Sequence, residues 1–538
     1  MPGFYGYRPQ GVSGRYSLMH KAGLKLGCVT GLLVLAACTP KLPPPPAFHP
    51  VAESSAPLPA APADIALVNR ITWGADTSTA QAAYSGAQSY LQSQLHPGND
   101  DGLPPDAQSA IAAMEITQRP LVKIEQSVRA LQQSAQQAKG MASYDDMQKA
   151  YQQKLNDLAR EAATRALLRD LYSRNQLKEQ LTWFWMNHFN VVQSKGEIRA
   201  LIGDYEETAI RPHVLGKFRD LLAATVFHPA MIQYLDNQQN AAGHINENYA
   251  REIMELHTMG VGSGYTQEDV QQLAHILTGV GVNFTGNPPK LSRAQQIDYR
   301  AGNLFEFNPA RHDYGTKQFL GETIKGSGVK EVAEAIVILS AQPATAHFIS
   351  KQLAQFFCCD APPDSLVDKM ADTFQKQDGD IAQVLATMFA APEFSASLGG
   401  KFKDPLHYAV SALRAAYGDT VILNAQPLMN WLNRMGEPLY GHETPDGYPL
   451  TEAAWSGPGE METRFEIARQ VGLGHSGLYK MPTDTAPEPA PPPVIQKTLY
   501  AQAIEPTLGT PTRTALEQAK TPADWNLLFL ASPEFMHR

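Results

Sequence analysis

The chain has 538 residues, of which 43% are hydrophobic and 18% are charged, a composition typical of a globular protein. Lys and Arg total 44 against 53 Asp and Glu, a net charge of -9. A nucleic-acid-binding protein normally has a basic excess, so no nucleic-acid partner is expected. Four cysteines are too few for a disulfide scaffold.

Residues 1–37 have the pattern of an export signal, in which basic residues precede twelve apolar residues, 26–37 (LGCVTGLLVLAA). At about 1.5 Å per residue a helix of this length covers roughly 18 Å, short of the ~30 Å hydrocarbon core, which disfavours a membrane span. The run ends in Leu-Ala-Ala-Cys at Cys38, which resembles the lipobox of a bacterial lipoprotein. The alternatives are a chance apolar run before a cysteine, and a start at Met19 rather than Met1.

Lipidation of Cys38 predicts a membrane partner, reached through the N-terminal lipid. Several acyl chains on one residue anchor a protein far more firmly than a single chain. The mature chain is acidic, so the lipid rather than attraction to anionic headgroups must hold it. Thr39, in place of Asp, resembles the sorting pattern of Gram-negative outer-membrane lipoproteins, and the predicted location is the cell envelope at that membrane.

Three regions follow from composition. Residues 38–63 form a proline-rich linker, because nine prolines in 39–63 exclude a helix or a sheet interior. Residues 64–538 form a single large helical domain, interrupted by a proline-rich insert at 482–493.

Hydrophobic periodicity predicts an all-α, bundle-like body with at most one small β-hairpin. Long helices are expected between 106 and 192, where apolar residues recur three and four positions apart. Strand candidates are short and lie near 282–285, 303–307 and 317–320. Further helices are predicted at 203–224, 245–260, 266–280, 330–340, 343–358, 364–376, 380–390, 404–416 and 426–435.

The predicted helix at 246–260 carries two candidate catalytic residues, Glu252 and His257. They flank its apolar face, where side chains enter a core boundary or a cleft. Their spacing of five residues is poor for one metal ion. The opposite side of the helix carries alternating charges at i, i+4 spacing, which predict a solvent-exposed face formed by Glu247, Arg251 and Glu255.

Two more candidate sites are polar pairs. Asn187 and His188 lie in Trp183–Asn190 (WFWMNHFN), which is apolar enough to be buried, so both need partners. They either tie helices together or hold a tuned acid/base or ligand. His312 and Asp313 follow in a polar loop that either lines a site or forms a surface turn in which Asp313 accepts backbone N–H groups.

Familiar catalytic motifs are missing from the chain, which contains no HExxH, GxSxG or phosphate-binding glycine loop. Cys358-Cys359 cannot form a CxxC motif, and two packed thiols are expected at a helix end.

The chain resembles the bacterial domain of unknown function 1800 family along most of residues 64–538. The resemblance implies an exported, largely helical protein, and it suggests an exported protein of the alkaline-phosphatase-like superfamily as a partner. The resemblance identifies no catalytic residues in this chain. The segments that carry it are Leu67–Gly74, Trp185–Phe189, Ile210–Asn237, Asn246–Val261, Tyr265–Gly279, Arg311–Gly321, Pro343–Lys351, Pro445–Trp455 and Leu530–Phe535.

Two hypotheses result. The first is a non-catalytic, membrane-anchored lipoprotein that binds or assists a secreted partner or an envelope polymer. The second is an acid/base or metal-assisted hydrolase of the envelope, with a divalent cofactor such as Zn, Mn or Fe. In the second, the five candidates His188, Glu252, His257, His312 and Asp313 meet in one open pocket.

Overall fold

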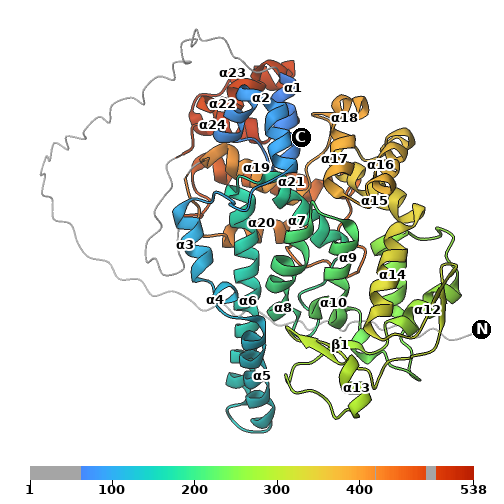
Figure 1. Cartoon of the computed structure of the whole chain (residues 1–538). Helices are drawn as coiled ribbons and strands as arrows, with labels where there is room; N and C mark the ends of the chain where they lie inside the picture. Colours follow the sequence, from blue (N-terminus) through green and yellow to red (C-terminus); the bar gives the residue numbers. More distant parts are fainter. Residues whose placement is uncertain (1–61, 419, 480–491) are drawn as a thin grey trace, which may run out of the picture. The chain divides into compact units, whose positions relative to one another are not determined.

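The computed structural model describes residues 62–418, 420–479 and 492–538 (Figure 1). The predicted signal peptide, the lipidation site Cys38, nearly all of the linker and most of the proline-rich insert lie outside these residues. The described residues are mainly helical, which confirms the all-α prediction. Among them no single helix is long and apolar enough to cross a membrane, and one pair bent by 67°, Val329–Ala341 with Pro343–Phe357, matches a span by length and composition.

Helices from the two ends of the described chain pack together (Figure 1). Arg70 of α1 explains part of this arrangement, since its buried guanidinium donates to Phe357 O at 2.6 Å and to Arg538 O at 2.5 Å. The helices involved are α1 (Pro62–Ile71), α2 (Thr77–Leu95), α19 (Pro405–Tyr417), α21 (Pro458–Leu473), α22 (Leu499–Ile504), α23 (Thr510–Glu517) and α24 (Pro522–Leu530).

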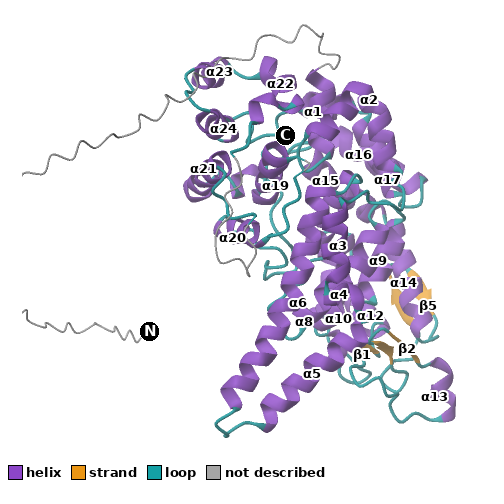
Figure 2. Cartoon of the chain, turned by 90° about the vertical axis from the view of Figure 1, so that its left-hand side faces the viewer, coloured by secondary structure: helices purple, strands orange, loops and turns teal. Residues whose placement is uncertain are grey.

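The predicted helical region 106–192 consists of five helices, of which α5 and α6 form an antiparallel pair visible in Figure 2. The apolar positions of α6 that carried the prediction, Leu155, Leu158 and Leu167 among them, are buried. The predicted burial of the WFWMNHFN segment is also confirmed, except for partly exposed Trp183. The five helices are α3 (Pro105–Ala113), α4 (Glu115–Gln118), α5 (Leu121–Gln137), α6 (Tyr144–Tyr172) and α7 (Gln176–His188).

The prediction of one continuous helix at 203–224 is wrong. Pro212 lacks the N–H that a helix interior needs, and the chain turns before a new helix begins at Phe218. The segment divides into α8 (Ile198–Asp204), the π-helix η1 (Tyr205–Ile210), the 3₁₀ turn η2 (Arg211–His213) and α9 (Phe218–Val226).

The remaining helical predictions agree with the structure to within a few residues. The predicted helix at 245–260 begins as an α-helix and ends as a π-helix. Cys358 is the C-terminal cap residue of α15, and its free thiol lies 3.2 Å from the free thiol of Cys359. Three short helices, α10 (Pro229–Tyr234), α13 (Arg293–Asp298) and α18 (Pro392–Ser397), lie outside the predicted helix ranges. The helices that match these ranges are α11 (Asn248–Glu252) with η4 (Ile253–Thr258), α12 (Gln267–Ile276), α14 (Val329–Ala341), α15 (Pro343–Phe357), α16 (Asp364–Lys376), α17 (Ile381–Phe389) and α20 (Gln426–Arg434).

The described residues contain two small antiparallel sheets, one more than the single hairpin predicted. A three-stranded sheet has the order β1 (Val280–Val282), β3 (Phe305–Phe307), β2 (Arg300–Gly302), and β4 (Lys317–Phe319) pairs with β5 (Glu322–Ile324). Asn303 and Leu304, which join β2 to β3, both have positive φ. A two-residue turn of this kind favours Asn and Gly, so Leu304 concealed the hairpin from sequence analysis.

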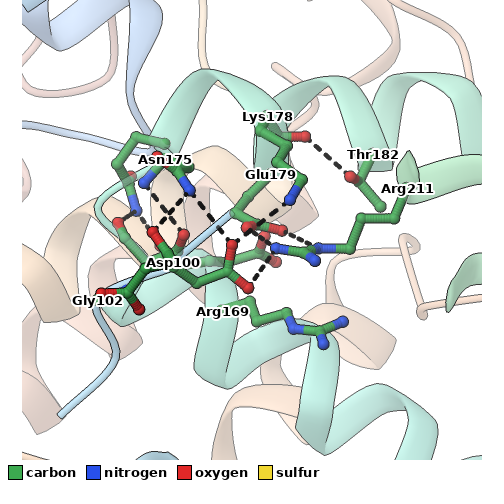
Figure 3. Close-up of polar contacts among 12 residues, drawn as sticks. Asp100, Gly102, Arg169, Asn175, Lys178, Glu179, Thr182 and Arg211 are labelled. Carbon is green, nitrogen blue, oxygen red and sulfur yellow. Dashed lines mark hydrogen bonds and ion pairs between the residues drawn. The ribbon is translucent and has the colours of Figure 1, made fainter. Parts of the chain in front are cut away.

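The start of α7 is held by a buried charge network (Figure 3). Arg211 donates to Glu179 at 2.6 and 3.0 Å and to Asp101 at 2.7 Å, and the Arg211 and Glu179 side chains are only 8% and 2% exposed. Asn175, which precedes α7, donates to the carbonyl groups of Gly98 and Asp100. These contacts tie the first turn of α7 to residues 98–101 and to Arg211, and so they fix the direction in which the helix runs.

Candidate functional site

Asn187, near the end of α7, holds the loop of residues 435–451 against the helices. Its Nδ2 donates to Tyr448 O at 2.9 Å, and its Oδ1 accepts from Tyr448 N at 2.6 Å. A Cβ at Gly447, where φ is +72°, would lie 2.2 Å from Asn187 O, so the close approach requires glycine. Of the two roles left open for Asn187, the structure therefore shows the helix-tying one.

Further side chains fasten the 435–451 loop along its length. Asn190 donates to the carbonyl groups of His442 and Thr444, and Tyr234 donates to Glu443 O at 2.7 Å. Backbone carbonyl groups are thus paired with side-chain donors where no helix or sheet is present to pair them. This fixes the position of the loop's side chains.

His188 and His257 lie side by side, with ring centroids 6.2 Å apart. His188 Nε2 donates to His257 O at 3.1 Å. Burial lowers the pKa of His188 to about 4, and burial together with His188 lowers the pKa of His257 to about 3. Both rings are therefore neutral at pH 7.

An open cleft of about 260 Å³ lies beside His188. Three aromatic rings, two carboxylates and two amides line it, together with His188 and aliphatic side chains, and no Lys or Arg is among the lining residues. We call it the α7–η4 cleft. Its lining is Phe184, Asn187, His188, Glu255, Leu256, Val261, Phe348, Gln352, Asp446, Tyr448 and Leu450.

Two carboxyl groups in this region have pKa values displaced in opposite directions. Partial burial and the charges of Glu255 and Asp446, both of which line the cleft, raise the pKa of Glu252, which is not itself a lining residue. Partial burial opposes ionisation of Asp446, but hydrogen bonds from Thr444 and His442 outweigh it and lower its pKa. Such a pair is the arrangement from which acid and base roles are assigned in enzymes.

His312 and Asp313 belong to a different cluster, at the N-terminus of α14. The His312 side chain is fully buried, with Nδ1 bonded to Thr278 O at 2.7 Å and Nε2 to Glu331 Oε1 at 2.8 Å. Lys317 pairs with the same Glu331 at 2.5 Å. Burial opposes ionisation of Glu331, yet these partners and the N–H groups of residues 327 and 328 lower its pKa.

Asp313 performs the turn role that sequence analysis gave as its alternative. Its Oδ1 accepts from Gly315 N at 2.8 Å, and its Oδ2 pairs with His275 Nδ1 at 2.7 Å. Hydrogen bonds from these groups lower the pKa of Asp313 despite partial burial.

The five candidates therefore do not meet in one pocket, as the hydrolase hypothesis expected. His188 lines the α7–η4 cleft, the His257 ring lies beside it, and Glu252 is close enough to the lining residues Glu255 and Asp446 for their charges to raise its pKa. His312 and Asp313 contact the separate Thr278, His275 and Glu331 set. Within the described ranges no three His, Cys, Asp or Glu side chains are placed to ligate one ion. These residues do not fit the divalent cofactor considered from sequence.

A second, smaller cavity lies behind the cleft and shares Asn187 and Tyr448 with it. Its lining includes Asp170, Glu206 and Glu437, and burial raises the pKa of all three. Perturbed carboxyl groups often mark active sites, but the volume is only about 40 Å³. A cavity of this size admits a few water molecules and no substrate.

Sequence analysis missed Glu255, Phe348, Asp446 and Tyr448 as lining residues of the cleft. Glu255 does form the predicted i, i+4 charge pair, since Arg251 bonds both Glu255 and Glu247, but it also faces the cleft. Phe348, Asp446 and Tyr448 lie in segments noted only for their family resemblance. That resemblance was the one signal that marked them.

Comparison with known families agrees with the resemblance of these segments. A family model described as "Protein of unknown function (DUF1800)" matches residues 66–537. The chain belongs to the DUF1800 family. No curated protein and no solved structure matches the chain.

The DUF1800 match covers every residue that lines the α7–η4 cleft, and it covers the His312–Glu331 cluster as well. Both belong to the family domain, whereas the predicted signal and the lipidation site precede the matched residues. Fold and cleft are thus features of the family domain in this chain.

Replacement of His312 tests whether its cluster is structural. We expect His312→Ala to lower the free energy of unfolding by about 1–3 kcal/mol, because it leaves buried acceptors without a partner. Urea unfolding followed by circular dichroism measures the loss. His347→Ala is the control, since the His347 side chain is 49% exposed and its removal is expected to cost less than about 0.5 kcal/mol. Equal stabilities of the two variants would contradict a structural role.

Proposed function

We propose that the protein is an exported, membrane-anchored lipoprotein of the cell envelope that binds a segment of an envelope polysaccharide in the α7–η4 cleft. The observation that carries this proposal is the lining of the cleft. Phe184, Phe348 and Tyr448 provide aromatic surface, and amide and carboxylate groups stand between them. A sugar ring has apolar faces that pack on aromatic rings and hydroxyl edges that bond to such polar groups.

The rigidity of the cleft supports binding without a large rearrangement. Phe348 of α15 packs against Gly260, at which a Cβ would lie 2.9 Å from the ring, and φ at Gly260 is +87°. Tyr448 is held by Asn187 through two backbone hydrogen bonds. Aromatic groups fixed in this way lose little conformational freedom when a ligand binds.

A polymer-binding role accommodates the partner suggested by the family resemblance. A lipoprotein that holds a polysaccharide strand would present it to another exported protein, and the alkaline-phosphatase-like superfamily is the class that the resemblance names. Nucleic acid is not expected as a ligand, because the chain is acidic and the cleft lining contains no Lys or Arg.

Removal of the Phe348 ring tests the binding function. We expect Phe348→Ala in the full-length protein in detergent to weaken binding of an envelope glycan oligosaccharide about tenfold, equivalent to about 1.4 kcal/mol of lost packing. Isothermal titration calorimetry measures the affinity. Phe465→Ala is the matched control, because Phe465 is an exposed aromatic residue outside the cleft. An unchanged affinity in Phe348→Ala, or an equal loss in the control, would refute the proposed site.

Replacement of Cys38 tests the anchor. The lipobox pattern predicts that the mature chain begins at a lipidated Cys38 and fractionates with membranes. We expect Cys38→Ser to remove the lipid and to release the protein from washed membranes, as measured by mass spectrometry of the N-terminus and by fractionation. Cys28→Ser, in the predicted signal, is the control and should leave both unchanged. A wild-type N-terminus at another residue would overturn the anchor.

Hydrolysis of the bound polymer is a second candidate, favoured by the opposite pKa displacements of Glu252 and Asp446. Glu252, with its raised pKa, would act as the protonated acid, and Asp446, with its lowered pKa, as the ionised base. The rate would therefore rise as pH increases through the pKa of Asp446 and fall as it increases through the pKa of Glu252.

A reducing-end assay tests this second candidate. We expect Glu252→Gln to lower the rate at least about 100-fold and to remove the loss of activity at high pH, because the general acid is gone. Glu268→Gln, on the exposed first turn of α12, is the control. If the wild type releases no product at any pH between the pKa of Asp446 and that of Glu252, binding alone remains as the function.

A further inference from the structure

We infer that the α7–η4 cleft takes a primary ammonium group, so that the polysaccharide bound there carries free amino groups in place of acetylated ones. This inference rests on the proposed binding function and names its ligand class. It follows from three properties of the cleft, which are its open hydrogen-bond acceptors, the small number of its open donors, and its charge.

His188 supplies the first acceptor. Its Nε2 must carry the ring proton, because its partner is the carbonyl oxygen of His257. The lone pair is then on Nδ1, and no described residue forms a hydrogen bond with that atom. His188 is only 9% exposed, but it lines the cleft, and its Nδ1 is accessible to solvent. A buried ring therefore presents an unpaired acceptor to a ligand.

Two carboxylates add further acceptors. Asp446 is 62% exposed and keeps its charge because its pKa is lowered, while Glu255 is 22% exposed. Arg251 partly neutralises Glu255 from outside the cleft, at 3.3 Å. No Lys or Arg lines the cleft to offset these two charges.

The polar hydrogens near the cleft are mostly engaged already. Asn187 Nδ2 donates to Tyr448 O, and the Tyr448 hydroxyl donates to Pro438 O at 2.8 Å. Gln352 is the remaining side-chain amide in the lining, and its N–H groups stay open to a ligand. An N-acetyl carbonyl could use that one amide, whereas an ammonium group provides three donors for His188 Nδ1 and the carboxylates, so the cleft suits the amine.

The aromatic rings favour the same ligand. A cation placed over the face of Phe348 or Tyr448 is attracted by the negative face of the ring, and the attraction increases as the cation loses water. Acceptors, carboxylates and aromatic faces thus surround one space of about 260 Å³. A neutral sugar can donate hydroxyl hydrogen bonds to these acceptors, but it brings no positive charge to the carboxylates or to the ring faces.

A pair of oligosaccharides of equal length tests the inference. A glucosamine oligomer and its fully N-acetylated counterpart are titrated into the full-length protein in detergent at pH 6, where the amines are protonated. We expect the glucosamine oligomer to bind at least about tenfold more tightly, and its affinity to fall as salt is added. Asp446→Asn and Glu255→Gln should each remove severalfold of this preference, because the amide keeps hydrogen-bonding capacity but loses the charge that distinguishes the two oligomers.

Glu462→Gln is the matched control, since Glu462 is an exposed carboxylate outside the cleft. If both oligomers bind equally and Phe348→Ala weakens both, the polymer-binding function holds and the inference about the amine is wrong. If neither oligomer binds, the proposed function itself fails. Equal effects of Glu462→Gln and Asp446→Asn would also overturn the inference, because the preference would then reflect overall charge.

Discussion

The paired hydrogen bonds between the Asn187 side chain and the backbone of Tyr448 are the contact on which the candidate site depends. They join the end of α7 to a loop more than 250 residues away along the chain, and they leave no polar atom of the amide or of that peptide without a partner. The loop has no helix or sheet of its own at this point, so its backbone groups depend on such side chains. Asp446, Tyr448 and Leu450, a quarter or so of the cleft lining, are placed by this contact.

Burial separates the histidines of this protein into different roles. The fully buried His312 has acceptor oxygens at both ring nitrogens, and its cluster begins α14 by pairing Glu331 with backbone N–H groups. His188 has only one such partner and reaches a cleft with the other nitrogen. Two residues of the same type in the same protein thus differ in what remains for a ligand. The difference is in the number of hydrogen bonds that the fold completes, rather than in the residue itself.

The helices were predictable because their apolar residues repeat at a local spacing that packing then buries, as in α6, α12 and α14 to α17. The exceptions had local causes that hydrophobic periodicity does not reveal. Pro212 broke a predicted helix, and Leu304 took a positive φ that its side chain does not favour. For the site, sequence analysis selected His188, which lines the cleft, together with His257 and Glu252, which do not. It could not separate them from His312 and Asp313, because all five are polar residues beside apolar segments.

The sequence alone determined the helical class, the extent of most long helices, the family and the lipobox pattern at Cys38, since each of these depends on residues close together in the chain. Tertiary structure decided which polar side chains are sealed and which face a cleft, and it brought Phe348 and Asp446 to the same space as His188. Those outcomes depend on contacts between residues tens to hundreds of positions apart. Burial, pKa and unpaired hydrogen-bonding capacity are properties of such contacts, and a linear pattern does not contain them.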